Sequence, residues 1–289
     1  MTSHDVVRRI RRLCHTRKVG HAGTLDPLAT GVLPVAVGQG TKLLQFLLAE
    51  NKSYRATFKL GETTDTLDCE GAVAVVRPVP KISFSELDSV CEAFRGRIEQ
   101  LPPMYSALKH NGVPLYKLAR KGETVERQPR QIRIDRLDIL DVDGESFTLE
   151  VDCSKGTYIR TLGHDIGEAL GCGAHLTALC RLRSGDFLLE DCFSLDQLEK
   201  SDDISGSLIP LIKALPCFPL VNLSEPAAEA LKFGIPPDLS HVTVASSLQP
   251  GDLVRLTYTE QLVAVARFAP ERTHEVRGDF ELVRVLVSH

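Results

Sequence analysis

The sequence predicts an α+β fold: a mixed, largely antiparallel sheet flanked by helices, followed by a small β-rich domain at the C-terminal end. The chain has 289 residues, which is about two domains at roughly 150 residues each. Residues 53–60, 131–140 and 146–153 alternate apolar and polar side chains, as half-buried strands do. Between these runs apolar residues recur at helical spacing, which predicts helices packed against the sheet.

The first fifty residues predict a helix, a loop, a strand and a second helix. Thr2 to Asp5 resembles a capping box, and apolar residues recur at helical spacing after it, with arginines on the other face. A glycine-rich loop covers 20–31, and a strand at Val32–Val37 and a helix from about Thr41 to Glu50 follow it. In the alternating strand after them, one face carries Tyr54, Ala56, Phe58 and Leu60.

The middle of the chain predicts a strand, a capped helix and an insertion. After a strand at 72–79, Ser83 and Glu86 cap a helix. Its predicted buried side carries Phe84, Leu87, Cys91 and Phe94. The segment 101–130 breaks the regular pattern and contains a short helix between Pro114 and Gly122. We expect this segment to protrude from the main body.

One helix and one strand follow the alternating run 146–153. The helix begins at Gly156 and Thr157 and ends at Gly171. In the strand after it, the predicted apolar face carries Leu176, Ala178, Cys180 and Leu182. Leu179 is therefore expected on the polar face, where a single apolar residue needs no special explanation.

The C-terminal tail changes character from about Pro216. A helix is predicted at Ser224–Phe233, and strand-like runs lie at Asp252–Tyr258, Gln261–Phe268 and Phe280–Ser288. We therefore divide the chain into residues 1–213 and 216–289, the second part being the separate β-rich domain.

Composition excludes several classes of protein. The longest uncharged stretch near the N-terminus, from Pro27 to Thr41, is shorter than the ~20 apolar residues of a membrane span and contains glycine and proline. No secretory signal is recognisable, so a cytoplasmic location is expected. The eight cysteines contain no CxxC pair and are expected as reduced core thiols. Dinucleotide, P-loop, HExxH and GxSxG motifs are missing from the sequence, and Ser106 to Lys109 matches S-x-x-K only as chance allows.

Basic residues gather in two segments although the net charge is −4. Residues 1–20 contain six Arg or Lys and one acidic residue, and residues 109–133 contain seven Arg or Lys and two acidic residues. Such a run is either a solvated face or a local patch for a polyanion.

Four segments are similar, in order, to the motifs of one family. They are GHAGTLDPLATGVLPVAVGQGTKL from Gly20, Lys52-Ser53-Tyr54 with the TTDTLD loop after it, PPMYSALKHNGVPLYKLARKG from Pro102, and GTYIRTLGHDIG from Gly156. By itself Asp26-Pro27 between glycines is a common turn former. Together the four segments resemble the TruB family of tRNA pseudouridine synthases, and the match runs in order from Thr2 to about Phe187. Family members usually begin with a short strand and an Asp-Lys-Pro-x-Gly turn before the Thr-Ser that stands here as Thr2-Ser3.

The resemblance implies a reaction and the residues that perform it. Uridine 55 in the T-loop of tRNA becomes pseudouridine without a cofactor or a metal. Asp26 matches the catalytic aspartate, which attacks either C1′ of the ribose or C6 of the uracil. Arg160 matches the arginine that pairs with this carboxylate and would keep it ionised.

The same resemblance implies roles for residues around the base. Tyr54 matches the tyrosine that stacks on the target base and assists deprotonation at C5. His21 matches a histidine that helps to extract the base, and Leu179 matches an apolar residue of the uracil pocket. Tyr158 lies beside Arg160 in the matching motif. Asp68 is a second candidate acid, although the turn around it could equally bond its own backbone.

The expected partner is the T-stem and T-loop of tRNA, with no membrane and no obligate protein partner. Flipping a base out of a folded loop costs a few kcal/mol, and basic side chains can hold the phosphates meanwhile. The 101–130 insertion would clamp the RNA. Its expected contact residues are Lys109, Arg120, Lys121 and Arg127. Residues 216–289 resemble the PUA-like domain that ends many of these enzymes.

Two other functions remain possible at this stage. A guide-RNA-dependent enzyme that modifies ribosomal RNA would use the same chemistry. A non-catalytic tRNA-folding chaperone would use the same binding surface. The clamp motif argues against the first function, and the presence of Asp26, Tyr54 and Arg160 argues against the second.

Overall fold

The structure is a computed structural model that describes residues 1–244, 247–271 and 278–286. It divides into two compact units. The first contains residues 1–3, 23–34 and 49–192, and the second contains residues 4–22, 35–48 and 193–289. The predicted division into 1–213 and 216–289 stays a prediction.

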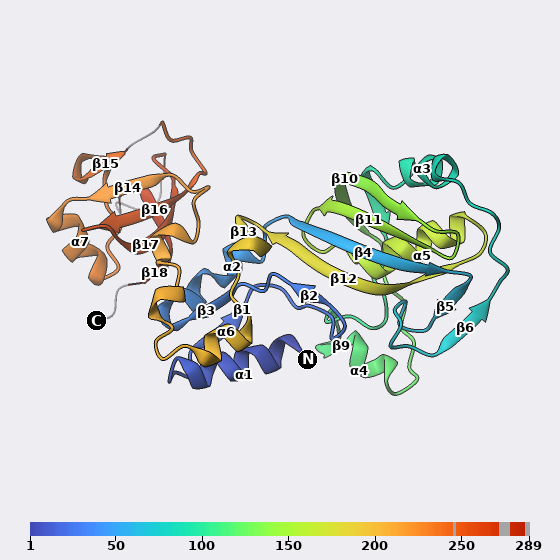
Figure 1. Ribbon diagram of the computed structural model, residues 1–289. Coiled ribbons are helices and arrows are strands. Elements are labelled where there is room, and N and C mark those ends of the chain that lie inside the picture. The colour runs from blue at the N-terminus through green and yellow to red at the C-terminus, as the bar shows by residue number, and fades with distance from the viewer. Residues whose placement is uncertain (245–246, 272–277, 287–289) are drawn as a thin grey trace. The chain divides into compact units, whose positions relative to one another are not determined.

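A seven-stranded mixed sheet forms the centre of the first unit (Figure 1). Its strands are β2 (Thr30–Gly31), β4 (Lys52–Leu60), β7 (Gly96–Gln100), β10 (Arg130–Val142), β11 (Ser146–Cys153), β12 (Ala174–Ser184) and β13 (Phe187–Leu188). The order β13-β12-β4-β11-β10-β7 is antiparallel throughout, and only β2 pairs in parallel, with β12. The predicted fold class is confirmed.

Two helices pack on this sheet. α5 (Ile159–Ala169) contacts β4 and β12, and α3 (Phe84–Glu92) contacts β10 and α5. A side chain at Gly163 would overlap the ring of Phe58, so glycine lets α5 approach β4 closely. The shared core contains Phe58, Phe147, Leu149, Leu162, Ile166 and Leu87, all buried. Burial of this apolar surface stabilises the unit.

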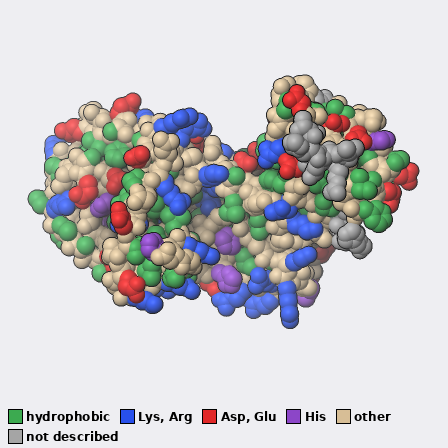
Figure 2. Space-filling model, turned by 180° about the vertical axis from the view of Figure 1, so that it is seen from behind, with side chains coloured by type: hydrophobic (Ala, Val, Ile, Leu, Met, Phe, Trp, Pro, Cys, Tyr) green, Lys and Arg blue, Asp and Glu red, His purple; other side chains and the backbone are tan. Residues whose placement is uncertain are grey.

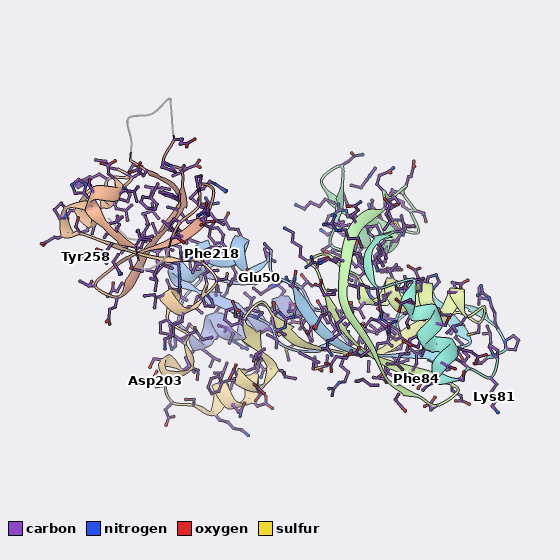
Figure 3. All side chains as sticks on the ribbon, turned by 90° about the horizontal axis from the view of Figure 1, so that it is seen from above. Glu50, Lys81, Phe84, Asp203, Phe218 and Tyr258 are labelled. Carbon is purple, nitrogen blue, oxygen red and sulfur yellow. The ribbon has the colours of Figure 1, made fainter. Side chains whose placement is uncertain are left out.

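The start of α3 is partly as predicted. Ser83 and Glu86 form the expected capping box, and Leu87 and Cys91 are fully buried. The expectation that Phe84 is buried on the same side is wrong, because 57% of this residue is exposed. Phe84 is the first helical residue, at the end of α3 (Figure 3). The helical period was correct, but the first turn of α3 leaves this side chain exposed.

A bulge in β12 corrects the predicted faces of that strand. The register with β4 shifts between Leu176 and Ala178. Because the extra residue reverses the alternation, Leu179 joins Leu176 on the buried side and Ala178 is exposed. Leu179 is only 7% exposed and packs in the core. The expectation of a leucine on the polar face is therefore wrong.

The remaining segments of the first unit are small. β5 (Glu62–Thr64) and β6 (Val73–Val76) form a hairpin, and the insertion contains β8 (Lys109–His110), β9 (Val113–Pro114) and α4 (Leu115–Ala119). Pro114 stands immediately before α4, as predicted. A 3-10 turn spans Leu189–Asp191.

The N-terminal part of the second unit differs from its prediction in detail. α1 (Ser3–Leu13) is present, but Ser3 lies in the helix and its hydroxyl bonds Leu25 instead of capping. The predicted strand at 32–37 is only β3 (Val35–Val37), paired with β1 (Val19–His21). The predicted helix at 41–50 is a 3-10 turn, Gly38–Leu43, followed by the short α2 (Leu44–Leu47). Pro34 and the glycines at 38 and 40 account for the shortening.

A five-stranded sheet occupies the C-terminal part of the second unit. Its order is β15-β14-β16-β17-β18, and α7 (Glu225–Lys232) supplies Ala227, Ala228 and Leu231 to its core. The strands are β14 (Leu220–Leu223), β15 (Val242–Val244), β16 (Leu253–Tyr258), β17 (Gln261–Phe268) and β18 (Phe280–Val285). β14 and β15 were not predicted because both are short. Residues 287 and 288 of the predicted last run lie outside the described residues.

Short helical segments complete the second unit. They are α6 (Leu195–Lys200) and 3-10 turns at Ser205–Ser207, Leu211–Lys213 and Leu239–His241. Phe46 of α2 meets Phe218 edge to face at 5.5 Å between ring centroids (Figure 3).

Two compositional expectations can be compared with the structure. All eight cysteines are free, but only Cys91, Cys153 and Cys172 are buried, so the expectation of core thiols is wrong for the exposed Cys69, Cys192 and Cys217. Among the described residues, every helix is too short or too polar to cross a membrane. The cytoplasmic location stays a prediction.

Candidate active site

A turn at the start of the first unit carries Asp26. The carbonyl oxygen of Asp26 accepts a hydrogen bond from the Ala29 amide at 2.9 Å, with Pro27 at the second position that prefers its fixed φ. The Leu25 amide donates to the Ser3 hydroxyl at 2.9 Å and holds the chain just before the turn. The Asp26 side chain is 31% exposed, so the carboxylate can reach a ligand.

Arg160 binds that carboxylate from the first turn of α5. Its Nε lies 3.0 Å from Oδ2 of Asp26, and its Nη2 donates to Oδ1 at 3.2 Å. The same guanidinium donates from Nη1 to Oδ2 of Asp68 at 3.2 Å. The contact that the resemblance implied between Arg160 and the aspartate is present, and it has the two-point geometry that orients a carboxylate.

Backbone carbonyls occupy the other donors of Arg160. Nη1 donates to the Thr66 carbonyl at 2.9 Å, and Nη2 donates to the Tyr105 carbonyl at 2.8 Å. A guanidinium has five N–H donors in a fixed plane, and these contacts engage all of its nitrogens. The side chain is only 7% exposed, so its orientation is set by the protein.

Asp68 is the second carboxylate of this cluster and is buried. Its Oδ1 accepts hydrogen bonds from the Thr66 hydroxyl at 2.6 Å and from the Glu70 amide at 3.1 Å. A bridge between Asp68 and Leu176 attaches the loop to β12. Asp68 therefore bonds its own turn, as expected, and it also contacts Arg160. Its part as a second candidate acid stays a prediction.

Burial and charge act in opposite directions on Asp26. Burial raises the pKa of the Asp26 carboxyl above its ordinary value, and the positive charge of Arg160 lowers it. The negative charge of Asp68 raises the pKa further. Burial outweighs the arginine, so the net direction of the pKa is upward. The expectation that Arg160 keeps Asp26 ionised stays a prediction.

Tyr54 is the third residue of β4, opposite Arg181 of β12 and Val151 of β11. It is half-buried and packs against the core. Burial raises the pKa of its hydroxyl, while the charge of Arg181 and a hydrogen bond with it lower that pKa. The predicted face of β4 is confirmed, and the ring lies in the same cluster as Leu28, Ala29 and Leu179.

Tyr158 stands immediately before α5, and its backbone is held from both sides. The Tyr158 amide donates to Oε1 of Gln100 at 2.8 Å, and Nε2 of Gln100 donates to the Tyr158 carbonyl at 3.0 Å. Burial raises the pKa of the Tyr158 hydroxyl above its ordinary value. Gln100 is 2% exposed, so α5 and Arg160 start from a fixed point.

His21 is the one predicted site residue in the second unit. It ends β1, opposite Val35 of β3. Its part in extracting the base stays a prediction.

The four predicted RNA-binding residues have different surroundings. Lys109, Arg120 and Lys121 are exposed, and the Arg120 guanidinium lies 5.6 Å from the centre of the Tyr116 ring. Arg127 is half-buried and donates to the Pro102 carbonyl at 2.9 Å. This contact joins the two ends of the insertion, so Arg127 has a structural bond that the other three do not show.

Sequence reasoning missed three groups at this site. Gln100 fixes the start of α5, the Tyr105 carbonyl accepts a bond from Arg160, and Arg181 is buried beside Tyr54. Only Arg181 left a signal in the sequence, because a basic residue stands within an apolar strand run. Among the described residues, no cluster of His, Cys, Asp and Glu could hold a metal ion.

The chain matches two family models. Residues 11–159 match the TruB family pseudouridylate synthase N-terminal domain, and residues 160–212 match the tRNA pseudouridylate synthase B C-terminal domain. The tRNA pseudouridine synthase B of Syntrophotalea carbinolica is 50% identical over 287 residues, covering 99% of this chain and 94% of the relative. The enzyme of the same name from Coxiella burnetii (strain Dugway 5J108-111) is 44% identical, covering 96% and 92%.

Solved structures show the same fold. A protein in an H/ACA RNP bound to a substrate RNA containing 2′-deoxyuridine matches with a TM-score of 0.75 and 26% identity, covering 100% of this chain and 82% of that one. A chain of a Cbf5-Nop10-Gar1 complex matches with a TM-score of 0.74 and 30% identity, covering 99% and 82%. With two family models and relatives at this identity, the chain belongs to the TruB family of pseudouridylate synthases.

Proposed function

We propose that this protein isomerises uridine 55 in the T-loop of tRNA to pseudouridine, with Asp26 as the nucleophile and without a cofactor. The observation that carries the proposal is the carboxylate of Asp26, partly exposed on a turn and bound at two points by the buried Arg160. Relatives of 44% to 50% identity are named tRNA pseudouridine synthase B, which supports tRNA as the substrate.

The proposed reaction rearranges one nucleotide. The bond between N1 of uracil and C1′ of ribose breaks, the ring turns, and C5 bonds to C1′. C5 then loses its proton, and N1 carries one in the product. Asp26 would form a covalent adduct at C1′ or at C6 of the uracil, which divides one difficult step into easier ones.

The neighbours of Asp26 suit these steps. Arg160 fixes the carboxylate so that little rearrangement is needed when it attacks. The ring of Tyr54 would stack on the flipped base, a contact worth about 1–3 kcal/mol. Its hydroxyl would take the C5 proton, and Leu179 and Tyr158 would enclose the base.

Two basic surfaces support binding of RNA. In the first unit, Lys109, Arg120 and Lys121 are exposed on the insertion. In the second unit, Figure 2 shows Lys and Arg side chains gathered along α1 and the loop after it. Arg8 and Arg12 of α1 and Arg17 and Lys18 of the loop are exposed. Contacts with phosphates hold a nucleic acid without reading its sequence. Residues 216–289 would add a PUA-like RNA-binding domain.

The rival with an observation in its favour is the guide-dependent modification of RNA. Two solved structures with this fold belong to complexes described as an H/ACA RNP and a Cbf5-Nop10-Gar1 complex. Their identity to this chain, 26% and 30%, is well below the 50% of the relative named tRNA pseudouridine synthase B. We therefore favour tRNA as the substrate.

The test uses the purified protein and an unmodified tRNA transcript with no other RNA or protein present. Pseudouridine-specific chemical mapping is expected to detect the product at position 55 and nowhere else. A transcript with cytidine at that position is the matched control and should remain unmodified. A protein that modifies its substrate only when a guide RNA is added would overturn the proposal.

A further inference from the structure

Among the described residues, Arg181 is the largest side chain that is almost completely buried, with 1% of it exposed. It lies in β12, and its guanidinium crosses to the loop that carries Asp26. Nε donates to the Val32 carbonyl at 2.7 Å, and Nη2 donates to the Gly23 carbonyl at 3.1 Å. These two acceptors stand on either side of Asp26 in the sequence, so one side chain holds both ends of its loop.

The backbone of Arg181 holds the same loop. The Val32 amide donates to the Arg181 carbonyl at 2.8 Å, and Gly31 pairs with Arg181 in the parallel ladder between β2 and β12. A Cβ at Gly31 would lie 2.2 Å from the Arg181 carbonyl oxygen, and its φ is +99°. Glycine is required there, and the close approach brings the loop against the strand.

The charge of Arg181 has no acidic partner among the ion pairs of the described residues. Arg160 differs, because it contacts both Asp26 and Asp68. A buried cation without a counterion is costly for stability. The charge of Arg181 also acts on Lys52, which lies on the same face of β4 as Tyr54. Burial and then this charge lower the pKa of Lys52 to about 8.

Tyr54, which the proposed reaction uses, is a cross-strand neighbour of Arg181. Arg181 stands directly opposite Tyr54 in the ladder between β12 and β4, so their side chains lie on one face of the sheet. Burial raises the pKa of the Tyr54 hydroxyl, whereas the charge of Arg181 and a hydrogen bond with it lower that pKa. Arg181 therefore contacts the loop of the nucleophile on one side and the stacking tyrosine on the other.

We propose that Arg181 is a positioning residue for the reaction, which fixes the Asp26 loop against β12 and places the Tyr54 hydroxyl relative to it. The inference rests on the proposed function. Its distinguishing feature is that the guanidinium acts on catalysis through two other residues and not by contacting RNA, since it is buried and faces carbonyl oxygens.

The test compares Arg181→Lys, which keeps the charge, with Arg181→Met, which keeps an unbranched apolar stem but removes the charge and the donors. Single-turnover rates are measured with saturating enzyme, and tRNA dissociation constants and melting temperatures are measured on the same preparations. Both variants should bind tRNA within about threefold of the wild type. The rate should fall at least about tenfold in Arg181→Met, and Arg181→Lys should recover part of it.

A double-mutant cycle with Tyr54→Phe separates positioning from packing. If Arg181 acts partly through the tyrosine hydroxyl, Arg181→Lys should reduce the rate less in the Tyr54→Phe background than in the wild type. Arg183→Lys, on the same strand but half-buried and beside Asp152, is the matched control and should leave the rate unchanged. The cycle needs only the lysine variant, so a poorly folding methionine variant does not prevent the test.

Two results would overturn the inference. One is a wild-type rate per folded molecule in Arg181→Lys and Arg181→Met with only the melting temperature lowered. The other is a rate loss in Arg181→Lys that is fully additive with Tyr54→Phe and accompanied by an equal loss of tRNA affinity. A wild-type protein that fails to modify tRNA would instead contradict the proposed function, so the two failures are distinguishable.

Discussion

The cluster around Asp26 and the basic insertion differ in how their arginines are bonded. Arg160 is buried, and its nitrogens bond two carboxylates and two carbonyls. Arg120 is exposed, and its neighbour is the Tyr116 ring. A reacting group must be held in one geometry before the substrate arrives. A group that binds phosphate needs only charge and reach, because it forms its bonds with the RNA.

The largest effect is expected from Asp26→Asn, which tests whether the buried cluster supplies the chemistry alone. We expect turnover to be abolished, because an amide cannot act as the nucleophile, and tRNA affinity to stay within a few fold. Single-turnover mapping and a binding titration on one preparation measure both. If more than a few per cent of the wild-type rate remains, the cluster around Asp26 does not supply the chemistry alone.

Arg160→Met should damage both stability and the pH profile. Removing one partner of a buried charge cluster costs about 3–5 kcal/mol, because Asp68 keeps an unpaired buried charge. Asp26 must be ionised to attack, so the rate falls as pH drops through the pKa of Asp26, which burial raises above its ordinary value. Since Arg160 lowers that pKa, its loss should move the acidic limb to higher pH.

Asp68→Asn is the opposing variant for that pH profile. The negative charge of Asp68 raises the pKa of Asp26, so its removal should move the acidic limb of the rate to lower pH. Chemical unfolding and rates across the pH range measure both variants. If the acidic limbs of Arg160→Met and Asp68→Asn move in the same direction, the acidic limb does not report the ionisation of Asp26.

Tyr54→Phe should have the next largest effect on the rate. It distinguishes a catalytic role of Tyr54 from a role in packing the core of the first unit. The ring, and with it about 1–3 kcal/mol of stacking, is retained. The hydroxyl is lost, so about a hundredfold loss in the final deprotonation is expected. RNA should bind normally and the glycosidic bond should break without product release. A destabilised variant with full activity per folded molecule would show a core tyrosine instead.

The smallest effect belongs to the insertion. Replacing Lys109, Arg120 and Lys121 with alanine should weaken tRNA binding and flatten the dependence of log K on log salt by up to roughly 0.7–0.9 per lost phosphate contact. The single-turnover rate at saturating enzyme should equal that of the wild type. Arg127→Ala is the matched control: its bond to Pro102 predicts a lower melting temperature with little change in slope. If the slope of log K against log salt is unchanged in the triple variant, the three residues form a solvated face and do not contact phosphates.

The pattern of apolar residues predicted the elements whose burial is regular. The face of β4 with Tyr54, Phe58 and Leu60 and the capping box at Ser83 depend on neighbours in sequence, and both are present. The exposure of Phe84 depends on which neighbours the fold brings to the first turn of α3. No local pattern contains that information, so the helical period alone placed Phe84 on the wrong side.

The site shows the same limit. The resemblance led to Asp26, Asp68 and Arg160, because each stands inside a recognisable motif, and the structure brings their side chains into contact. Gln100 belongs to no such motif, and its two bonds to Tyr158 join residues 58 positions apart. A residue whose only task is to hold another backbone leaves no chemical signature in the sequence.

By itself the sequence determined the fold class, the family resemblance and the residue types of the reaction, because alternation, capping and motif order are properties of neighbouring residues. Only the tertiary structure decided that Leu179 is buried and that Arg181 holds the Asp26 loop. The first depends on a bulge in β12, and the second on a bond between residues 149 positions apart. Contacts of that separation form only when the sheet aligns its strands, so no local pattern reports them.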